Sequence, residues 1–353
     1  MAKDSTGSLQ DKRKKKKSPL SAKQKKARLS KQDRLNKAAG IVEQPLALDQ
    51  PLVPKLDGHV PVLMAEVLQY LDIKPGQVYV DVTLGGGGHT RAILTQEPTC
   101  KVIGLDWDKS VIETTGALLK EEFPDRFFPV WGNFSKIHQL LTGAGFHAVH
   151  GILADFGTSQ IQIKNKDGFS VYNDTFLDMR FSSAMYKTTA YKVVNYADEK
   201  ELSDIFFEFG QESYSRKIAR AIVLRRQQKY FKTTGDLAQF IKDLTPGDYH
   251  KIHPATKVFQ ALRIFVNKEL DNIQAFLQNT RHILHDGGRL VCISFHSLED
   301  RIVKQFFKDH GSRSFITRYY DLATKGACMA SQEEILQNRS SRSARLRAGI
   351  LRI

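Results

Sequence analysis

The chain has few cysteines, and those it has do not form a pattern. Cys100, Cys292 and Cys328 are scattered and odd in number, which fits neither a disulfide framework nor a zinc site. No metal site is therefore expected. Cys100 and Cys292 lie in or beside apolar runs, so we expect them to be small core side chains in a reducing cytosol.

Long apolar segments are also lacking. No stretch approaches 18 consecutive apolar residues, so no membrane-spanning helix is predicted. The first residues carry no apolar segment of the kind found in secretory signals. They are rich in lysine rather than arginine and include Asp4 and Asp11, which argues against a mitochondrial transit peptide. These absences predict a cytoplasmic protein without a membrane partner.

Positive charge, in contrast, is abundant and unevenly placed. Of the formal net charge of +15, residues 1–40 carry +11, from 14 Lys or Arg and 3 Asp, which leaves +4 for the other 313 residues. Residues 1–50 also hold few large apolar side chains, so we predict a disordered basic arm. Such an arm speeds encounter with nucleic acid by releasing counterions. A tail that only improves solubility is the alternative.

Beyond the arm, the apolar pattern alternates between strand and helix. Strands are predicted at Val78–Val82, Lys101–Leu105, Phe127–Val130 and Ala148–Leu153. Helices are predicted at Pro61–Tyr70, Thr90–Gln96, Val111–Leu119 and Ile137–Leu141. Strand–helix alternation with short links is typical of an α/β fold, with a parallel sheet covered by helices on both faces.

The alternation then stops for about 90 residues. Amphipathic helices are predicted at Glu201–Phe209, Ser215–Arg226 and Thr234–Leu244, and a strand pattern returns only at Gly288–Phe295. An interrupted sheet indicates an inserted helical lobe. We therefore predict four parts: the arm 1–50, a first α/β part 51–163, an inserted helical domain 164–255, and a second α/β part with a basic tail, 256–353.

A glycine-rich loop follows the first strand and opens a helix. Gly85–Gly88 allows close backbone approach to a ligand, and the N–H groups of the helix that follows can hold a phosphate or a carboxylate. Asp106 ends the second strand about 20 residues later, where a carboxylate accepts hydrogen bonds from ribose hydroxyls. A dinucleotide and the adenosyl part of S-adenosylmethionine both fit these features. A flexible turn is the alternative for the loop.

Two further strand ends carry candidate site residues. Phe134 follows the third strand, where it is placed either to stack on an adenine or to pack under the next helix. Asp155 ends the fourth strand, at the sheet edge where α/β proteins bind ligands. An exocyclic base amine is a poor nucleophile, so its methylation needs an acceptor for the amine protons and in-line positioning. Asp155 can supply that acceptor, with a helix cap or an ion-pair partner as its alternative role.

At this point the residues resemble a known family. Residues 59–304 are similar to the bacterial methyltransferases that modify N4 of a cytidine in the decoding region of small-subunit ribosomal RNA. The resemblance is carried by the motifs His59–Leu63, Thr83–His89, Leu177–Arg180, His253–Thr256, Phe259–Ile264, Val266–Asn267 and Ser294–Arg301, and by the ending Arg342–Arg347.

The resemblance implies a Rossmann-like fold with an inserted helical substrate domain, and S-adenosylmethionine as cofactor. It implies cofactor contacts at Gly87, Gly88, His89, Asp106, Phe134, Asp155 and Gln162. Asp155 is expected to be the catalytic residue because of its position at the end of the fourth strand. It also implies a ribosomal RNA partner within a small ribosomal subunit or a late assembly particle, and a possible homodimer.

Other charged residues are candidates for contact with RNA or for the reaction cleft. Cations that gather in and near the inserted segment predict a basic helix face: Arg180, Arg216, Lys217, Arg220, Arg225, Arg226 and Lys229. A solvated helix face is the alternative. A second set is predicted to line the cleft or to support it: Arg263, Asn267, His296, Glu299 and Arg301.

Three other functions fit parts of this pattern. A nicotinamide-dependent oxidoreductase uses the same sheet, and a non-catalytic RNA-binding or ribosome-assembly factor can keep the fold. Methylation of adenine or of DNA is not distinguished by residue spacing. The motifs listed for the resemblance favour the methyltransferase of cytidine.

Overall fold

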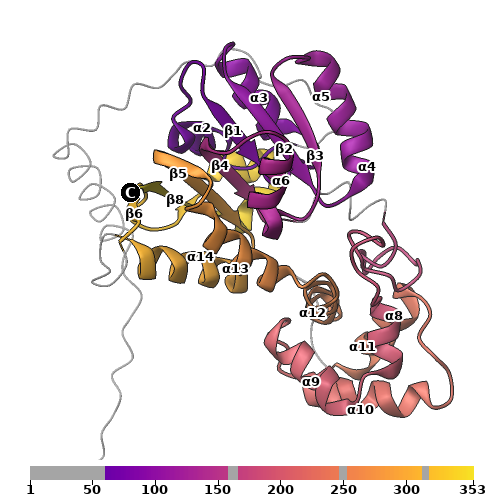
Figure 1. The fold of residues 1–353 in the computed structure, drawn as a ribbon. Helices are drawn as coiled ribbons and strands as arrows, with labels where there is room; N and C mark the ends of the chain where they lie inside the picture. Colours follow the sequence, from indigo (N-terminus) through magenta and orange to yellow (C-terminus); the bar gives the residue numbers. More distant parts are fainter. Residues whose placement is uncertain (1–59, 158–165, 246–252, 312–317) are drawn as a thin grey trace, which may run out of the picture. The chain divides into compact units, whose positions relative to one another are not determined.

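The computed structural model describes residues 60–157, 166–245, 253–311 and 318–353 (Figure 1). All of them belong to one unit, Val53–Ile353. The predicted basic arm and the predicted cofactor residue Gln162 lie outside the described residues.

A single mixed sheet forms the centre of the described chain. Its strands are β1 (Val78–Asp81), β2 (Lys101–Asp106), β3 (Phe127–Trp131), β4 (Val149–Asp155), β5 (Leu284–Ser294), β6 (Tyr320–Leu322), β7 (Cys328–Met329) and β8 (Arg345–Leu351). They run in the order β3-β2-β1-β4-β5-β8-β6, with β7 paired to β8. Strands β1 to β5 are mutually parallel, as predicted for the first four, and the order reverses between β1 and β4. The fold is therefore an α/β fold of the Rossmann-like kind.

Helices cover both faces of this sheet because successive strand residues point to opposite faces. On one face, Tyr79 and Val102 pack with α2 (Met64–Leu71), α3 (Gly88–Gln96) and α5 (Ala117–Glu122). On the other, the next residues, Val80 and Ile103, pack with α6 (Ile137–Gly143), α13 (Glu269–Thr280) and α14 (Ser297–His310). Shorter helical turns complete these layers: α4 (Lys109–Val111), η1 (Ile112–Gly116), η2 (Phe134–Lys136), α15 (Gln332–Gln337) and η3 (Arg339–Ser343).

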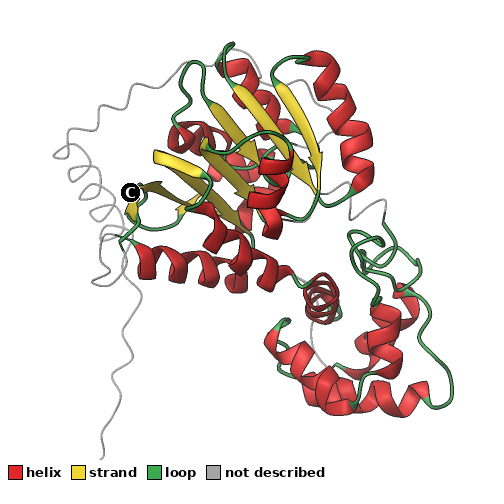
Figure 2. Cartoon of the chain, viewed as in Figure 1, coloured by secondary structure: helices red, strands yellow, loops and turns green. Residues whose placement is uncertain are grey.

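The inserted segment forms helices with a core of their own. They are α8 (Ala190–Tyr196), α9 (Glu199–Glu208), α10 (Ser215–Arg226) and α11 (Thr234–Leu244), and Figure 2 shows only helices and loops there. The predicted helices Ser215–Arg226 and Thr234–Leu244 match α10 and α11. Helix α12 (Thr256–Asn267) also contributes Val258, Leu262 and other residues to this core. We call residues 166–245 the lobe.

The end of the chain differs from the predicted basic tail. Residues 345–351 form strand β8, which lies between β5 and β6 and is antiparallel to both. The two arginines that suggested a tail are held by one buried carboxylate, because Arg347 Nε lies 2.8 Å and Arg345 Nη1 3.3 Å from Asp300. Burial raises the pKa of Asp300, but the two guanidinium groups bring it below its ordinary value. The tail is thus part of the sheet.

Other predictions from composition can be compared with the structure. Cys100 and Cys292 are buried, as expected for core side chains, and burial raises the pKa of the Cys100 thiol to about 11. Cys328 is partly exposed, and its Sγ lies 3.5 Å from Tyr70 Oη. Among the described residues, no helix is both long enough and apolar enough to cross a lipid bilayer.

One buried side chain joins helix α12 to the loop that enters the lobe. Asn267 is fully buried, and its Oδ1 accepts a hydrogen bond of 2.8 Å from the N–H of Phe181. Its Nδ2 donates to the carbonyl of Met179 at 2.7 Å. Met179 has a φ of 62°, a left-handed conformation that disfavours a bulky residue, so these two bonds offset local strain. Asn267 therefore supports the cleft instead of lining it.

We predict that Asn267→Ala destabilises the protein by about 2–4 kcal/mol, because it leaves a buried N–H and a buried carbonyl without partners. Urea unfolding followed by circular dichroism measures the change. Asn279→Ala is the matched control, since within the described residues the side chain of Asn279 bonds only to the carbonyl of Ala275 in its own helix; its effect should stay within about 0.5 kcal/mol. Equal effects of the two substitutions would contradict the prediction.

Candidate active site

A cavity of about 690 Å³ opens at the carboxyl ends of the parallel strands. It lies where the strand order reverses between β1 and β4, the position at which open α/β sheets bind ligands. The glycine loop after β1, the ends of β2 and β4, the start of the lobe, and helices α12 to α14 all contribute to its wall. Sheet and lobe residues therefore share one cavity.

The glycine loop is shaped by close packing as well as by turn geometry. Gly87 has a φ of 74°, and a Cβ there would lie 2.8 Å from Leu119 Cδ1. A Cβ on Gly88 would lie 2.2 Å from Pro61 Cγ. Neither position accepts a larger residue without a shift of its neighbours. The loop holds the first turn of α3 at the cavity, with its N–H groups available to an anionic group.

Three strands end in carboxylates that lie close to this loop. Asp81 of β1 is almost fully buried and accepts hydrogen bonds from Thr90 Oγ1 at 2.8 Å and the N–H of Thr83 at 3.1 Å. Asp106 of β2 accepts from the N–H groups of Asp108 and Gly85 at 2.9 and 3.0 Å. Burial raises the pKa of Asp106 to about 7, with help from the neighbouring Asp108 and Asp81. Each Asp106 oxygen keeps a lone pair for a hydroxyl group of a ligand.

The third carboxylate, Asp155 of β4, reaches into the cavity with 21% of its side chain exposed. Thr83 Oγ1 accepts a hydrogen bond of 2.8 Å from the N–H of Asp155 and so fixes the end of the strand. His89 Nδ1 lies 4.0 Å from Asp155 Oδ2, while His89 Nε2 lies 2.9 Å from the carbonyl of Val62. Burial raises the pKa of Asp155 to about 6. The negative charges of Asp81 and Glu299 also raise this pKa, whereas His89 lowers it.

Aromatic rings form the wall next to Asp106. Trp107 stacks on Phe181 with ring centroids 4.6 Å apart and lies 5.4 Å from Phe134. Phe134 also contacts Phe276 and Phe156, so it both packs in the core and lines the cavity. The predicted alternatives for Phe134, stacking on a base and packing under a helix, are therefore not mutually exclusive. Such a wall presents aromatic surface against which a planar base can pack.

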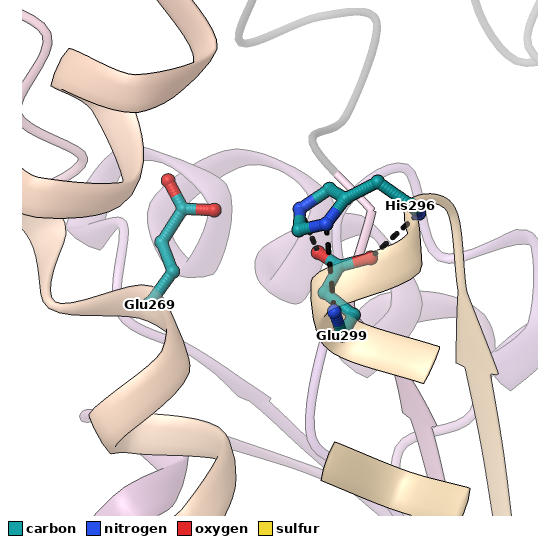
Figure 3. Close-up of side chains that lie close together, drawn as sticks. All are labelled: Glu269, His296 and Glu299. Carbon is teal, nitrogen blue, oxygen red and sulfur yellow. Dashed lines mark hydrogen bonds and ion pairs between the residues drawn. The ribbon is translucent and has the colours of Figure 1, made fainter. Parts of the chain in front are cut away.

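Charged residues from α12, α13 and α14 form the wall on the other side. Arg263 and Glu269 form a two-point ion pair, with N–O distances of 2.9 and 3.0 Å. His296 caps α14 by accepting from the N–H of Glu299 through Nδ1, and Glu299 Oε2 accepts from the N–H of His296 (Figure 3). The same oxygen accepts from the N–H of Phe295. Because Nδ1 accepts, the ring proton is on Nε2.

The wall from α13 and α14 has the ligand atoms of a metal-ion site, but their charge and protonation do not suit a cation. One ligand atom from each of Glu269, His296 and Glu299 lies within 4.8 Å of the others. The guanidinium of Arg263 already neutralises Glu269, and the Nε2 proton of His296 would have to leave before that nitrogen bound a metal. Nε2 is buried and, within the described residues, has no hydrogen bond of good geometry, although Glu299 Oε1 lies 3.1 Å away. It is thus a donor available to a ligand.

The structure brings together most of the residues predicted from sequence. Six of them line the one cavity: Gly87, Gly88, His89, Asp106, Phe134 and Asp155. Arg263, His296 and Glu299 line it too, whereas Asn267 is buried beside it and Arg301 is exposed outside its lining. Asp81, Trp107 and Glu269 were missed by the sequence reasoning. Trp107 directly follows Asp106, the last residue of β2, and this position in the sequence could have indicated an aromatic residue beside the ligand.

The predicted basic face of the lobe divides into two groups. Arg180 pairs with Asp178, and Arg225 pairs with Asp236 and lies over the ring of Phe231, so both stabilise the lobe itself. Arg216, Lys217 and Arg220 are exposed on α10. Lys217 Nζ donates to the carbonyl of Leu244 at 2.7 Å and Arg226 Nη1 to that of Val194 at 2.8 Å, whereas Lys229 is exposed after the end of α10.

The chain is similar to proteins of known class. Residues 57–350 match the model of the MraW methylase family. A ribosomal RNA small subunit methyltransferase H of Carboxydothermus hydrogenoformans is 43% identical over 303 residues, which cover 82% of this chain and 96% of that protein. The protein of the same name from Ehrlichia chaffeensis is 43% identical, covering 84% and 100%. That from Neorickettsia sennetsu is 44% identical, covering 82% and 94%.

The carboxylates of the cavity provide a test of its electrostatics. In a ¹³C NMR titration of the free protein, we expect Asp155 to titrate near pH 6 and Asp106 near pH 7. Asp81→Asn removes a neighbouring negative charge and should lower both midpoints, whereas Asp300 should titrate below its ordinary range in both proteins. Midpoints of Asp155 and Asp106 at the ordinary value of about 4 would contradict the geometry.

Proposed function

The chain belongs to the MraW methylase family, and from that premise we propose how its residues carry out the reaction. It is an S-adenosylmethionine-dependent methyltransferase that acts on N4 of a cytidine in small-subunit ribosomal RNA. The observation that supports the assignment of roles is the position of Asp155, which projects into a cavity bounded by the glycine loop, an aromatic wall and the lobe.

The cavity suits S-adenosylmethionine, which supplies an electrophilic methyl group when bound. Asp106 has free lone pairs for the two ribose hydroxyls, and the wall of Trp107 and Phe134 suits an adenine. Gly87 and Gly88 sit where side chains would displace their neighbours. Three carboxylates at the strand ends favour a ligand that carries a positive sulfonium. His89 helps position Asp155 from the first turn of α3.

Asp155 is the acceptor for the amine. The lone pair of cytidine N4 is delocalised into the ring, so a hydrogen bond from the amine to a carboxylate raises its nucleophilicity. When bound, S-adenosylmethionine would supply the methyl group from its sulfonium, and Asp155 would take one proton from the amine and release it to solvent. Since burial raises the pKa of Asp155 to about 6, this group is ionised at neutral pH yet basic enough to receive a proton.

The opposite wall orients the base. A cytosine presents the N3 acceptor beside its amine, and His296 offers a buried Nε2–H without a good partner among the described residues. The backbone N–H of Glu299 holds His296 through Nδ1, and Glu269 holds Arg263 through their ion pair. Reaching such a cavity requires the target base to leave its stack. Adenine also carries an acceptor beside its amine, so this contact orients the base without selecting cytosine.

Several broader features belong to the same proposal. The substrate is the RNA within a small ribosomal subunit or a late assembly particle, in the cytoplasm, and a homodimer is compatible with this role. The division into a first part 51–163, an inserted domain 164–255 and a second part 256–353 assigns RNA recognition to the insert. Helix α12 is shared between the two, because its apolar side packs in the lobe core and Arg263 lines the cavity. The basic arm 1–50 adds non-specific attraction to RNA.

The function is tested by mass spectrometry of ribosomal RNA nucleosides from cells with and without the gene. We expect N4-methylated cytidine of the small-subunit RNA to disappear with the gene and to return with the wild-type copy. An unchanged nucleoside profile would defeat the proposal. Loss of an N6-methyladenosine instead would move the target to adenine.

We predict that Asp155→Ala lowers kcat at saturating S-adenosylmethionine by at least about 100-fold, because the amine loses its proton acceptor. The readout is transfer of a labelled methyl group to small subunits from cells that lack the gene. Asp125→Ala, at an exposed position outside the cavity, is the control and should keep full activity. Circular dichroism checks that both variants fold, and retained turnover in Asp155→Ala would remove the assigned role.

A further inference from the structure

Exposed aromatic rings are concentrated in the lobe. Seven aromatic side chains are well exposed within the described residues, and six of them lie between residues 166 and 245. They are Tyr172, Phe176, Tyr196, Phe207, Tyr214 and Tyr230, with Trp131 as the one outside the lobe. A monomeric surface seldom gathers large rings in this way without a partner.

Three of these rings form a continuous row with Tyr191. Phe176 and Tyr191 have ring centroids 5.4 Å apart, Tyr191 and Tyr196 6.4 Å, and Tyr196 and Tyr230 5.7 Å. Tyr196 is 62% exposed and Tyr230 43%. We call these four residues the ring row. It joins three parts of the lobe that are distant in sequence, namely the loop before α8, α8 itself, and the turn after α10.

The backbone holds the ring row in place. Phe176 pairs with Thr233 in an antiparallel bridge, and the N–H of Leu177 donates to the carbonyl of Lys232 at 3.1 Å. Asn195, next to Tyr196, is bonded in both directions to the backbone of Phe231, at 2.8 and 3.0 Å. The rings are therefore presented by a fixed frame, which lowers the entropic cost of binding a ligand.

The ring row begins near the active-site cavity. Tyr172, which is 80% exposed, lines that cavity and stands four residues before Phe176. The segment between them is tied to the start of α11, since the N–H of Thr175 donates to Thr234 Oγ1 at 2.9 Å. The segment 172–176 therefore connects the cavity lining to the first residue of the ring row.

Positive charge accompanies the rings. Lys192, Arg226, Lys229 and Lys232 lie on the same segments as the ring row, and three of the four are exposed. Arg226 and Lys229 line a second hollow of about 380 Å³ beside Tyr230. The neighbouring acids Asp174 and Asp198 each accept a backbone N–H bond, from Gly235 at 2.8 Å and Glu201 at 2.7 Å, so both carboxylates are held at helix starts. The surface thus combines aromatic faces with cations.

We propose that the ring row is a stacking platform for single-stranded nucleotides that adjoin the target cytidine. The inference rests on the proposed function, because it takes the occupant to be the RNA substrate. Bases stack on aromatic rings regardless of sequence, while the phosphates between them meet the cations. Such a platform holds the neighbouring strand unstacked, which favours delivery of the target base into the cavity.

The test compares Tyr196→Ala and Tyr230→Ala with wild type in the full-length protein. The probe is a fluorescent single-stranded oligouridine of about 12 nucleotides, within the range that one binding site covers. We expect each variant to bind it about 5- to 150-fold more weakly, the loss of one stacked base. The slope of log affinity against log salt should not change, since no cation is removed.

Two controls separate stacking from other causes. Phe207→Ala removes a ring that is 64% exposed on α9 but makes no ring contact within the described lobe, so it should bind like wild type. Tyr196→Phe keeps the ring and should restore affinity. Equal losses for Phe207→Ala, or failure of Tyr196→Phe to restore binding, would overturn the proposal.

Methyl transfer to small subunits distinguishes this inference from the function itself. Tyr196→Ala should raise the KM for the subunit and leave S-adenosylmethionine binding unchanged. Wild-type RNA affinity and KM in both ring variants, with methylation intact, would refute the platform but not the enzyme. Weaker binding to whole subunits with normal binding to oligouridine would also refute it, because it would indicate a protein contact. Absence of methylation by wild type would instead refute the function.

Discussion

The site depends on the burial of three carboxylates at the ends of neighbouring parallel strands. Asp81, Asp106 and Asp155 end β1, β2 and β4, and burial raises the pKa of each. Their desolvation and mutual repulsion oppose folding, and hydrogen bonds from Thr90 and from the N–H groups of Gly85 and Asp108 offset part of that cost. A ligand that carries positive charge relieves the rest, as the sulfonium of the proposed cofactor would.

Much of this arrangement could be predicted from sequence because local patterns determine it. The apolar run before Asp81 gives β1, and the amphipathic period of Ser215–Arg226 gives α10 with the same bounds. Asp106 and Asp155 were found because the carboxyl ends of parallel strands share one edge. The order of the strands and the reversal between β1 and β4 depend on long-range pairing, so sequence indicated the edge but not which residues face each other across it.

The features that were missed depend on tertiary contacts. Strand β8 looks like a basic tail until Asp300 of α14 is placed beside Arg345 and Arg347. Glu269 belongs to the cavity wall because it pairs with Arg263, which lies on the preceding helix. Trp107 forms the aromatic wall because it stacks on Phe181 of the lobe. In each case the partner residue is distant in sequence or lies on another element. The periodicity of apolar residues predicts single helices and strands, so it cannot predict such a contact. The ring row is the extreme example, since its rings come from three separate segments.

In the proposed function the lobe and the sheet edge have different tasks, because the lobe recognises the RNA and the sheet edge carries the amine acceptor. In the proposed reaction the amine must approach Asp155 within hydrogen-bonding distance, yet a base in a helix keeps its amine paired and stacked. The carboxylates and the glycine loop cannot unstack a base, because they act only once it has entered the cavity. Asn267 fixes the loop that carries Phe181 to the helix that carries Arg263, so one buried amide keeps the wall of the cavity in register with the lobe. In the proposed function, loss of that register displaces the proposed RNA surface of the lobe from Asp155 even though every side chain of the cavity remains present.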